Sequence, residues 1–386
     1  MYSEMIDIRT DSDTHSTLGI IALESCLELG DKIDKRIIEK RSAEVQKNIP
    51  DTYRVPTREV RFSNGEGKVK IIETVRGKDI YILCDIGNYS CTYNMYGFKN
   101  HKGPDEHFQD IKRALSAVGG KAHRTTVIMP LMYSSRQHRR KGRESLDCAM
   151  ALQELEKLGV NDVLTFDVHD PNIQNAAHLV SFENLYPTYD IVKKLIENEK
   201  DIFLNKSETL IISPDTGAMD RAIYYSEVLG LDIGLFYKRR DHSVIVKGKN
   251  PIVQHEYMGR PIEGQNILIV DDMISSGESM VDVVKFLKEK KAKKIFMAVT
   301  FSLFTEGTKK FDKMYAEGLF DKLYSTNLTY APKEVLNAPW YEQVDLSNFL
   351  ADIIDNLNNN KSIEPLIQST YDLRRFINEK RNALQD

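Results

Sequence analysis

The sequence predicts an α/β protein built from two doubly wound, mostly parallel sheets. From about residue 55 onward, short apolar runs alternate with helical patterns, and this alternation is typical of βαβ units. One such run, residues 267–270, is apolar at every position, as expected of a strand covered on both faces. Seven or more strands, with a polar break near residues 199–208, indicate two sheets rather than one.

The elements can be placed in order along the chain. Strands are predicted at residues 80–86, 126–131, 162–168, 209–213, 233–237, 266–270 and 295–301. Helical patterns lie near residues 106–118, 144–158, 217–229, 278–291 and 346–358. Residues 1–50 are polar and carry no recognisable motif, although Ile33, Ile37 and Ile38 give one stretch an amphipathic pattern. We therefore expect an N-terminal domain over 1–190, a C-terminal domain over 191–345 and a C-terminal helical segment over 346–386.

Composition and charge argue against two classes of partner. The chain has 53 Lys and Arg against 57 Asp and Glu, so its formal net charge of −4 gives no sign of nucleic-acid binding. No apolar run approaches the ~20 residues of a membrane span. The N-terminus lacks the basic stretch and apolar core of a secretory signal. Neither a nucleic-acid nor a membrane partner is expected.

The cysteines point to a reducing compartment. Cys26, Cys84, Cys91 and Cys148 lie apart without CxxC spacing, which argues against both a zinc site and a disulfide framework. Cys84 and Cys148 fall in apolar patterns and are expected to be buried. The cytoplasm is the natural setting for such a chain.

The most informative stretch of the chain is residues 266–291. Asp271 and Asp272 follow the apolar run, and a small, hydroxyl-rich turn, residues 275–279, precedes a helical pattern. This turn places N–H groups and serine hydroxyls at a helix N-terminus, where an anion is favoured. Two carboxylates at the end of a strand can hold sugar hydroxyls or a hydrated Mg²⁺ beside that anion. The stretch predicts a sugar-phosphate site, although an ordinary strand–turn–helix with capping acids would look similar.

Charged and potentially metal-binding side chains recur at the ends of other predicted strands. They are Arg136 and Gln137, His169, Asp215, and Lys238 with Arg240. Ligands of doubly wound sheets bind beyond the carboxyl ends of the strands, so these side chains are expected to converge. Any one of them could be a packed or solvated residue. Together, oxygen ligands, an imidazole and fixed cations favour a magnesium–polyphosphate site, as phosphoryl or diphosphoryl transfer requires.

Further stretches make a family resemblance specific. They are RFSNGE at 61–66, ETVRGKD at 73–79, SRQ at 135–137 and DVH at 167–169. The 266–279 stretch is similar to the phosphoribosyl-diphosphate-binding motif of the phosphoribosyltransferase-like fold. In this order, and over about residues 58–367, the motifs resemble those of the ribose-phosphate diphosphokinase (PRPP synthetase) family. The resemblance implies two phosphoribosyltransferase-like domains.

The resemblance also implies a reaction and a role for each matching residue. In that family, Mg-ATP donates its β,γ-diphosphate to the anomeric hydroxyl of ribose 5-phosphate, giving phosphoribosyl diphosphate and AMP. The implied ATP contacts are Phe62, Asn64, Gly65, Glu66, Arg136 and Gln137, the first four on a loop from a neighbouring subunit of a dimer-based, possibly hexameric homo-oligomer. The implied Mg²⁺ ligands are His169 and Asp215, and the implied catalytic cations are Lys238 and Arg240 on a mobile loop. The implied ribose-phosphate contacts are Asp271, Asp272, Ser275, Ser276, Gly277, Glu278 and Ser279.

Several departures from the family pattern affect what can be expected. His138 stands where an acid usually follows Arg-Gln, and Ser275 replaces another usual acid. Glu278 replaces a residue that is frequently small, which puts a carboxylate near the expected phosphate. The N-terminus is longer than usual, and residues 88–104, rich in Tyr and Asn, are interpreted as an insertion. These departures leave the acceptor and the regulation of the reaction open.

Three other functions remain compatible with parts of the sequence. The same diphosphate transfer could use a larger acceptor with a ribose 5-phosphate end, such as ADP-ribose. A base phosphoribosyltransferase would share the 266–279 stretch, but it would not need RFSNGE or SRQ and is normally one domain. A non-catalytic regulatory subunit tends to lose the Lys/Arg pair that is present here as Lys238 and Arg240.

Overall fold

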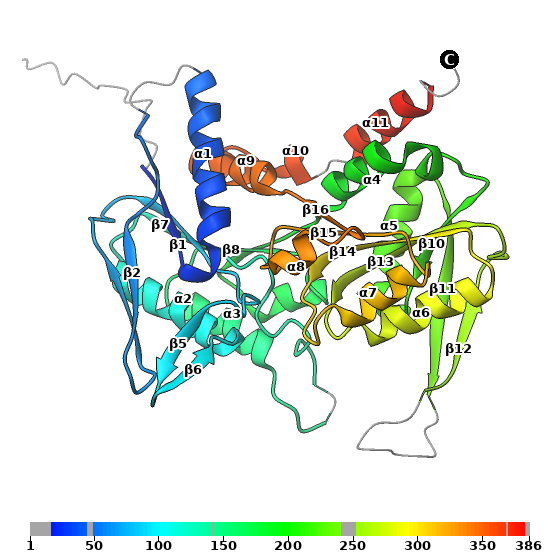
Figure 1. The fold of residues 1–386 in the computed structure, drawn as a ribbon. Helices are drawn as coiled ribbons and strands as arrows, with labels where there is room; N and C mark the ends of the chain where they lie inside the picture. Colours follow the sequence, from blue (N-terminus) through cyan, green and yellow to red (C-terminus); the bar gives the residue numbers. More distant parts are fainter. Residues whose placement is uncertain (1–16, 45–48, 141, 241–251, 368–369, 383–386) are drawn as a thin grey trace, which may run out of the picture.

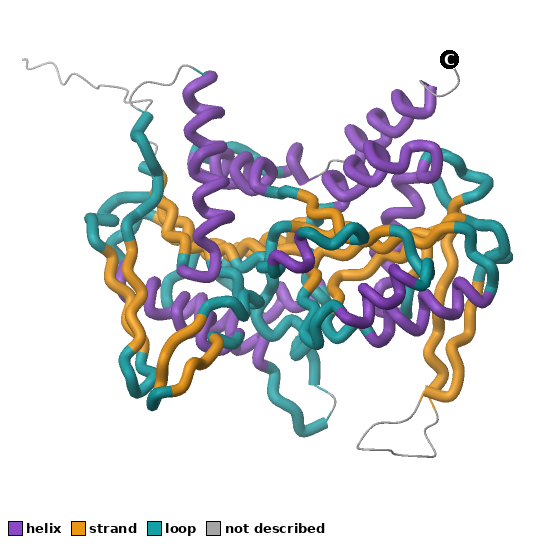
Figure 2. Tube along the Cα trace, in the orientation of Figure 1, coloured by secondary structure: helices purple, strands orange, loops and turns teal. Residues whose placement is uncertain are grey.

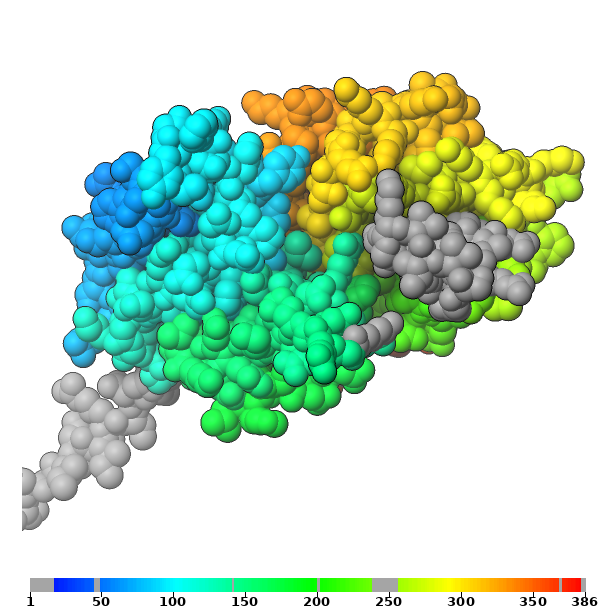
Figure 3. Space-filling view, turned by 90° about the horizontal axis from the view of Figure 1, so that it is seen from below, coloured from blue at the N-terminus to red at the C-terminus, as the bar shows by residue number. Residues whose placement is uncertain are grey.

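The computed structural model describes residues 17–44, 49–140, 142–240, 252–367 and 370–382, and for 200–201, 238–240 and 252–255 it describes the backbone alone. Two sheets lie side by side, and each carries helices on both faces (Figures 1 and 2). In the view from below, the N-terminal half and the residues from about 260 onward occupy opposite sides of the surface (Figure 3). The prediction of an α/β protein with two mostly parallel sheets is confirmed.

The first sheet has five parallel strands in the order β1-β4-β7-β8-β9. They are β1 (Leu18–Ala22), β4 (Asp79–Leu83), β7 (Arg124–Ile128), β8 (Asp162–Phe166) and β9 (Ser181–Leu185). The helices around it are α1 (Leu27–Ala43), α2 (Pro104–Val118) and α3 (Asp147–Lys157). Two small antiparallel hairpins extend from this half: β2 (Thr57–Arg61) with β3 (Gly67–Ile71), and β5 (Thr92–Met95) with β6 (Phe98–His101).

The second sheet has seven strands in the order β12-β11-β10-β13-β14-β15-β16, and all its pairings except β11–β12 are parallel. They are β10 (Thr209–Ser213), β11 (Asp232–Arg240), β12 (Ile252–Met258), β13 (Asn266–Ile274), β14 (Lys294–Ser302), β15 (Lys322–Thr326) and β16 (Tyr341–Val344). The main helices on its faces are α4 (Thr188–Phe203), α5 (Met219–Leu229), α6 (Glu278–Glu289) and α7 (Lys309–Ala316), with the short α8 (Lys333–Leu336).

The C-terminal segment joins the two halves. Helix α9 (Ser347–Asn358) packs on α1, and α11 (Thr370–Asn382) packs on α4 and α5, with α10 (Glu364–Ile367) between them. One continuous hydrophobic cluster contains side chains of both sheets, including Ile82, Phe166 and Leu268. The predicted boundary between residues 190 and 191 falls inside α4, so the three-part division stays a prediction.

Some elements differ from the sequence-based expectations. Residues 1–50 were expected to carry no motif, but Leu18–Ala22 forms a fully buried strand of the first sheet, and the amphipathic stretch belongs to α1. The 88–104 insertion contains the β5–β6 hairpin. All four cysteines are buried and free, as predicted for Cys84 and Cys148. Within the described part of the chain, every helix is too short or too polar to cross a membrane.

Candidate active site

The site is organised by β13 and the start of α6. The sequence suggested that Asp271 and Asp272 follow the strand, but β13 continues through both acids to Ile274. The reason is that pairing with β14 continues, since Asp271 lies opposite Val299 and Ile274 opposite Ser302. Both carboxylates are therefore held on a rigid strand, not on a loop.

The turn between β13 and α6 has a shape that only glycine allows. Gly277 has φ +77°, and a Cβ there would lie 2.6 Å from a ring carbon of Phe311. The Ser275 carbonyl accepts a hydrogen bond from the Thr305 N–H (3.0 Å), which fixes the other side of the turn. Helix α6 begins at Glu278, so the first backbone N–H groups of a 12-residue helix are directed at the turn.

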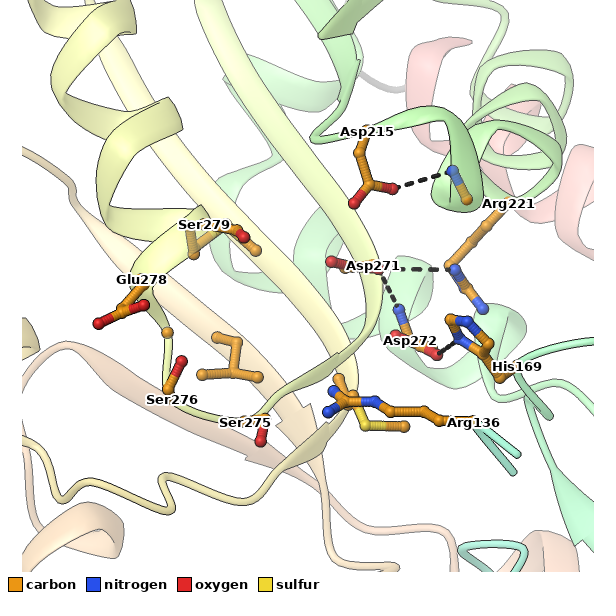
Figure 4. Close-up of a pocket in the computed structure, with 15 residues that line it drawn as sticks. Arg136, His169, Asp215, Arg221, Asp271, Asp272, Ser275, Ser276, Glu278 and Ser279 are labelled. Carbon is orange, nitrogen blue, oxygen red and sulfur yellow. Dashed lines mark hydrogen bonds and ion pairs between the residues drawn. The ribbon is translucent and has the colours of Figure 1, made fainter. Parts of the chain in front are cut away.

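The acids and the turn line one cavity of about 430 Å³ (Figure 4). Residues from both halves contribute to it, because Arg136 follows β7 and His169 follows β8. Figure 4 shows Arg136 reaching towards the turn. The predicted site residues that the cavity brings together are Arg136, His169, Asp215, Asp271, Asp272, Ser275, Ser276, Gly277, Glu278 and Ser279. The convergence expected at the strand ends is present for these residues.

A network of charges holds the acids in place. His169 Nδ1 lies 2.9 Å from Asp272 Oδ2. Arg221, on α5, makes hydrogen bonds of 3.1 and 3.0 Å to the two carboxylate oxygens of Asp167, and its guanidinium lies 3.9 Å from Asp271. One arginine thus stands between the N-terminal and the C-terminal acids and partly offsets both.

This network shifts the protonation of the site. Burial and the charge of Asp272 raise the pKa of Asp271 well above its usual range, although Arg221 opposes the shift. Burial also disfavours the charged form of Asp272, but the hydrogen bond from His169 and the charge of Arg221 outweigh it and hold its pKa below its usual range. The same hydrogen bond raises the pKa of His169. Because the raised pKa of Asp271 favours its neutral form, a cation bound beside this acid would favour the charged form.

Asp215 is oriented by the turn after β10. Its Oδ1 accepts hydrogen bonds from the N–H groups of Gly217 (2.9 Å) and Ala218 (3.3 Å), so the carboxylate caps the 3₁₀ helix Thr216–Ala218. Among the described residues, no three His, Cys, Asp or Glu side chains lie close enough together to hold a metal ion by themselves.

Both halves of the chain match models of known protein families. Residues 18–159 match the family model for the N-terminal domain of ribose phosphate pyrophosphokinase, and residues 181–327 match the phosphoribosyl transferase domain. The two models together match well over half of the chain. The chain belongs to the ribose-phosphate pyrophosphokinase family.

Relatives in this family align with most of the chain. A ribose-phosphate pyrophosphokinase from Vibrio cholerae is 28% identical over 310 residues, covering 79% of this chain and 89% of that protein. One from Mycoplasma pneumoniae is 26% identical over 309 residues, covering 79% and 85%. A crystal structure of phosphoribosylpyrophosphate synthetase from Mycobacterium smegmatis has the same fold, with a TM-score of 0.72 and 20% identity over 89% of this chain and 99% of that one.

Five of the residues that the family resemblance implies for ATP binding do not line the cavity of this chain. Phe62, Asn64, Gly65 and Glu66 lie in or beside the β2–β3 turn, at the opposite end of the molecule from α6 (Figure 1). Gln137 is exposed beside Arg136 but does not line the cavity.

The predicted catalytic pair lies on a different element from the one expected. Lys238 and Arg240 were expected on a loop, but their backbone belongs to β11, where Lys238 pairs with His255 and Arg240 with Ile252 of β12. The reason is that β11 continues beyond the predicted end at residue 237 as one arm of an antiparallel hairpin. Their side chains and residues 241–251 lie outside the described residues.

Sequence reasoning gave no role to three residues in or beside the site, Arg221, which lines the cavity, and His138 and Asp170, which lie next to His169. Arg221 was visible in the run after β10 but was given no role. His138 was noted as a departure from a usual acid; its Nε2 lies 3.2 Å from Asp170 Oδ2, and its ring centroid is 5.4 Å from that of His169. Asp170 thus places a carboxylate beside His138. These contacts join separate loops, which explains why spacing in the sequence did not indicate them.

Glu278 points away from the cavity centre (Figure 4). Its side chain is 73% exposed, and Lys310 Nζ lies 3.8 Å from its carboxylate. The extra carboxylate noted in the sequence is therefore directed at solvent and a lysine, which reduces its repulsion of an anion bound in the turn.

Proposed function

We propose that this enzyme transfers the β,γ-diphosphate of ATP to the anomeric hydroxyl of ribose 5-phosphate, giving phosphoribosyl diphosphate and AMP. The names of its relatives support synthesis of phosphoribosyl diphosphate. The observation that carries the proposal is the cavity lined together by the hydroxyl-rich turn, two strand-borne acids, Arg136 and His169.

The C-terminal wall of the cavity suits a ribose phosphate. N–H groups at the start of α6 and the hydroxyls of Ser275, Ser276 and Ser279 can hold the 5-phosphate. Asp271 and Asp272 would accept hydrogen bonds from the sugar hydroxyls. Because these groups lie on β13 and on a turn fixed by Gly277, the anomeric hydroxyl can be held for in-line attack on the β-phosphorus.

The other wall suits the polyphosphate. Arg136 reaches into the cavity and would pair with phosphate oxygens. During transfer, negative charge builds on the oxygen that leaves with AMP. We assign to Lys238 and Arg240, on β11, the offsetting of that charge in a site closed to water.

Magnesium fits the residues present. Asp215 and His169 line the same cavity as Asp271 and Asp272, and a cation held there would favour the charged form of Asp271, whose pKa is otherwise raised. Mg²⁺ commonly keeps several waters and takes one or two protein ligands plus substrate phosphates, so a set of three close protein ligands is not required. Asp215 and His169 would hold the ion, which would neutralise charge on the transferred diphosphate when bound.

We also propose that activity requires a homo-oligomer. The adenosine-binding residues suggested by the family resemblance, 62–66, are remote from the cavity of their own chain, so a second copy would have to supply them. Sedimentation velocity combined with activity across protein concentrations tests this, and a fully active monomer contradicts it.

The decisive experiment is an assay of AMP release from ATP with different acceptors. We expect release with ribose 5-phosphate, and far less with ADP-ribose, because the outward position of Glu278 removes the reason to expect a less charged phosphate. Preferred use of ADP-ribose would replace the acceptor but keep the chemistry. Base-dependent consumption of phosphoribosyl diphosphate without use of ATP would indicate a phosphoribosyltransferase. Absence of all these activities would indicate a regulatory subunit.

A further inference from the structure

The insertion at residues 88–104 forms a hairpin that lies against the β2–β3 turn. Strands β5 and β6 are joined by Tyr96 and Gly97, both with positive φ (50° and 82°), as in a tight two-residue hairpin turn. The Tyr96 N–H donates to the Ser63 carbonyl (3.0 Å), so the tip of this hairpin touches the turn that carries Asn64, Gly65 and Glu66.

Met95 packs directly on Gly65. A Cβ built on Gly65 would lie only 2.6 Å from Met95 Sδ, which means that the thioether rests against the glycine backbone. Gly65 has φ +91°, and its N–H donates to the Phe62 carbonyl (2.9 Å), which closes the turn. The conformation of the turn and the position of the Met95 side chain are therefore coupled.

A second contact, between Arg61 of β2 and Tyr93 of β5, joins the two hairpins further from their turns. The Arg61 guanidinium lies 5.2 Å from the ring centroid of Tyr93, and its Nη1 lies 3.4 Å from the Gly65 carbonyl. The Tyr93 hydroxyl lies 3.2 Å from Glu106 on α2. Tyr93 and Met95 are two positions apart on β5, so they share the face that is turned to β2 and β3.

Ion pairs hold the end of the β5–β6 hairpin, at Lys102, against strand β2 and helix α2. The Lys102 side chain is 1% exposed and forms ion pairs with Glu59 of β2 (3.3 Å) and Asp110 of α2 (3.2 Å). The same Asp110 pairs with Arg61 (2.8 Å). Burial opposes the charge of Lys102, but its acidic partners outweigh this and raise its pKa, so the anchor stays charged.

We infer that the β5–β6 hairpin is a brace that positions residues 62–66, with Met95 and Tyr93 as positioning residues. The physical reason is that an isolated two-stranded hairpin such as β2–β3 is marginally stable. An unbraced turn would lose conformational entropy on binding a ligand, whereas a braced turn is already ordered. This inference rests on the proposed function, in which the turn contacts the adenosine of ATP.

The test compares Met95→Ala with Met95→Leu, which keeps the side-chain volume, and with Asn94→Ala, a matched control on the opposite face of β5. In Met95→Ala we expect KM for ATP to rise about five- to tenfold, as the loss of one ordered contact would cause, while kcat and KM for ribose 5-phosphate change less than about twofold. Met95→Leu and Asn94→Ala should resemble the wild type.

A second variant removes the brace altogether. Because the Lys102 N–H donates to the Cys91 carbonyl (2.8 Å), the ends of the hairpin are adjacent, and residues 92–101 can be replaced by Gly-Gly. We expect a larger rise in KM for ATP in this variant than in Met95→Ala.

Amide hydrogen exchange at residues 62–66, measured without ligands, separates this inference from the proposed function. Faster exchange in Met95→Ala and in the Gly-Gly variant, but not in Asn94→Ala, supports the brace even if the enzyme does not use ATP. Unchanged exchange together with unchanged KM for ATP overturns it. An equal loss of affinity for both substrates also overturns it, because that result indicates general destabilisation.

Discussion

Each sheet carries acidic side chains at the carboxyl end of an inner strand, Asp85 in the first sheet and Asp271 and Asp272 in the second. The surroundings of these acids differ. In the first sheet, Asp85 follows β4 and is 3% exposed. It accepts hydrogen bonds from the N–H groups of Gly87 (2.9 Å) and Tyr330 (2.8 Å) and from the Thr329 hydroxyl (3.1 Å). In the second sheet, Asp271 and Asp272 face a cavity.

The difference shows what makes a strand-end acid structural or functional. Both carboxylate oxygens of Asp85 accept hydrogen bonds, from Gly87 and from the loop after β15, so this acid joins the two halves of the protein. Asp271 and Asp272 have Arg221 and His169 as partners, and both acids still line the cavity, where a ligand can reach them. We expect Asp85, the closed acid, to affect the stability of the fold, and Asp271 and Asp272, the open acids, to affect turnover.

The largest effect on activity is expected for Lys238, the cation that we assign to the cavity of Asp271 and Asp272. Lys238→Ala should lower kcat by about 10²–10³, with a modest change in ATP affinity, because the cation acts mainly on charge that develops during transfer. The thermal midpoint should stay near the wild-type value. Steady-state kinetics and thermal melts measure both quantities. Near-normal turnover would show that Lys238 has no part in the mechanism. It would also weaken the contrast between Asp85 and the cavity of Asp271 and Asp272.

A smaller but still large effect is expected for Asp272→Asn. The amide keeps a hydrogen-bond acceptor for His169 but removes one of two adjacent negative charges, so we expect kcat/KM to fall by roughly 10–10². Because His169 and Arg221 favour the charged form of Asp272, its neutralisation should also lower the thermal midpoint slightly. A variant that is both unstable and fully active would show that Asp272 belongs with Asp85 as a structural acid.

The closed acid predicts a pH dependence of stability. Burial raises the pKa of Asp85 from 3.8 to about 7, against the opposing hydrogen bonds from Tyr330, Gly87 and Thr329. Between about pH 4 and pH 7 the folded state therefore binds more protons than the unfolded state. Its contribution makes the free energy of unfolding decrease as pH rises through this window, by up to roughly 1.4 kcal/mol per pH unit, and level off above it.

Thermal or urea unfolding from pH 5 to pH 8 checks this expectation. Asp85→Asn should show a shallower decrease, while Asp51→Asn, at an exposed acid, should follow the wild type. Turnover of Asp85→Asn at a temperature well below its melting point should be close to normal. Identical slopes for the wild type and Asp85→Asn would show that Asp85 does not titrate in this range.

The smallest effect is expected for Glu278→Gln. Its side chain is exposed and only loosely paired with Lys310 (3.8 Å), so kcat/KM for ribose 5-phosphate should change less than about twofold. The ratio of kcat/KM for ribose 5-phosphate and ADP-ribose should also stay the same. A selective gain for ribose 5-phosphate would mean that Glu278 turns towards the phosphate and that the open site contains a third acid.

The sequence by itself determined the class of fold and much of the candidate site. Strand β10 lies at the predicted residues, and β13 and α6 begin where predicted, because apolar runs and helical periodicity are local patterns. The turn at 275–279 was also visible, since Gly277 and the surrounding serines are adjacent in the chain. By contrast, the short buried run of β1 was missed because it resembles any other apolar segment until its pairing with β4 is known.

The tertiary structure decided which of these residues share an environment. His169 and Asp272 are 103 positions apart, and Asp85 and Thr329 are 244 apart, so neither pair has a local signature. The sequence likewise does not predict that the β5–β6 hairpin packs on residues 62–66. Local patterns specify whether a segment is strand or helix, whereas the protonation and accessibility of an acid depend on groups that only the packing of the two sheets brings within a few ångströms.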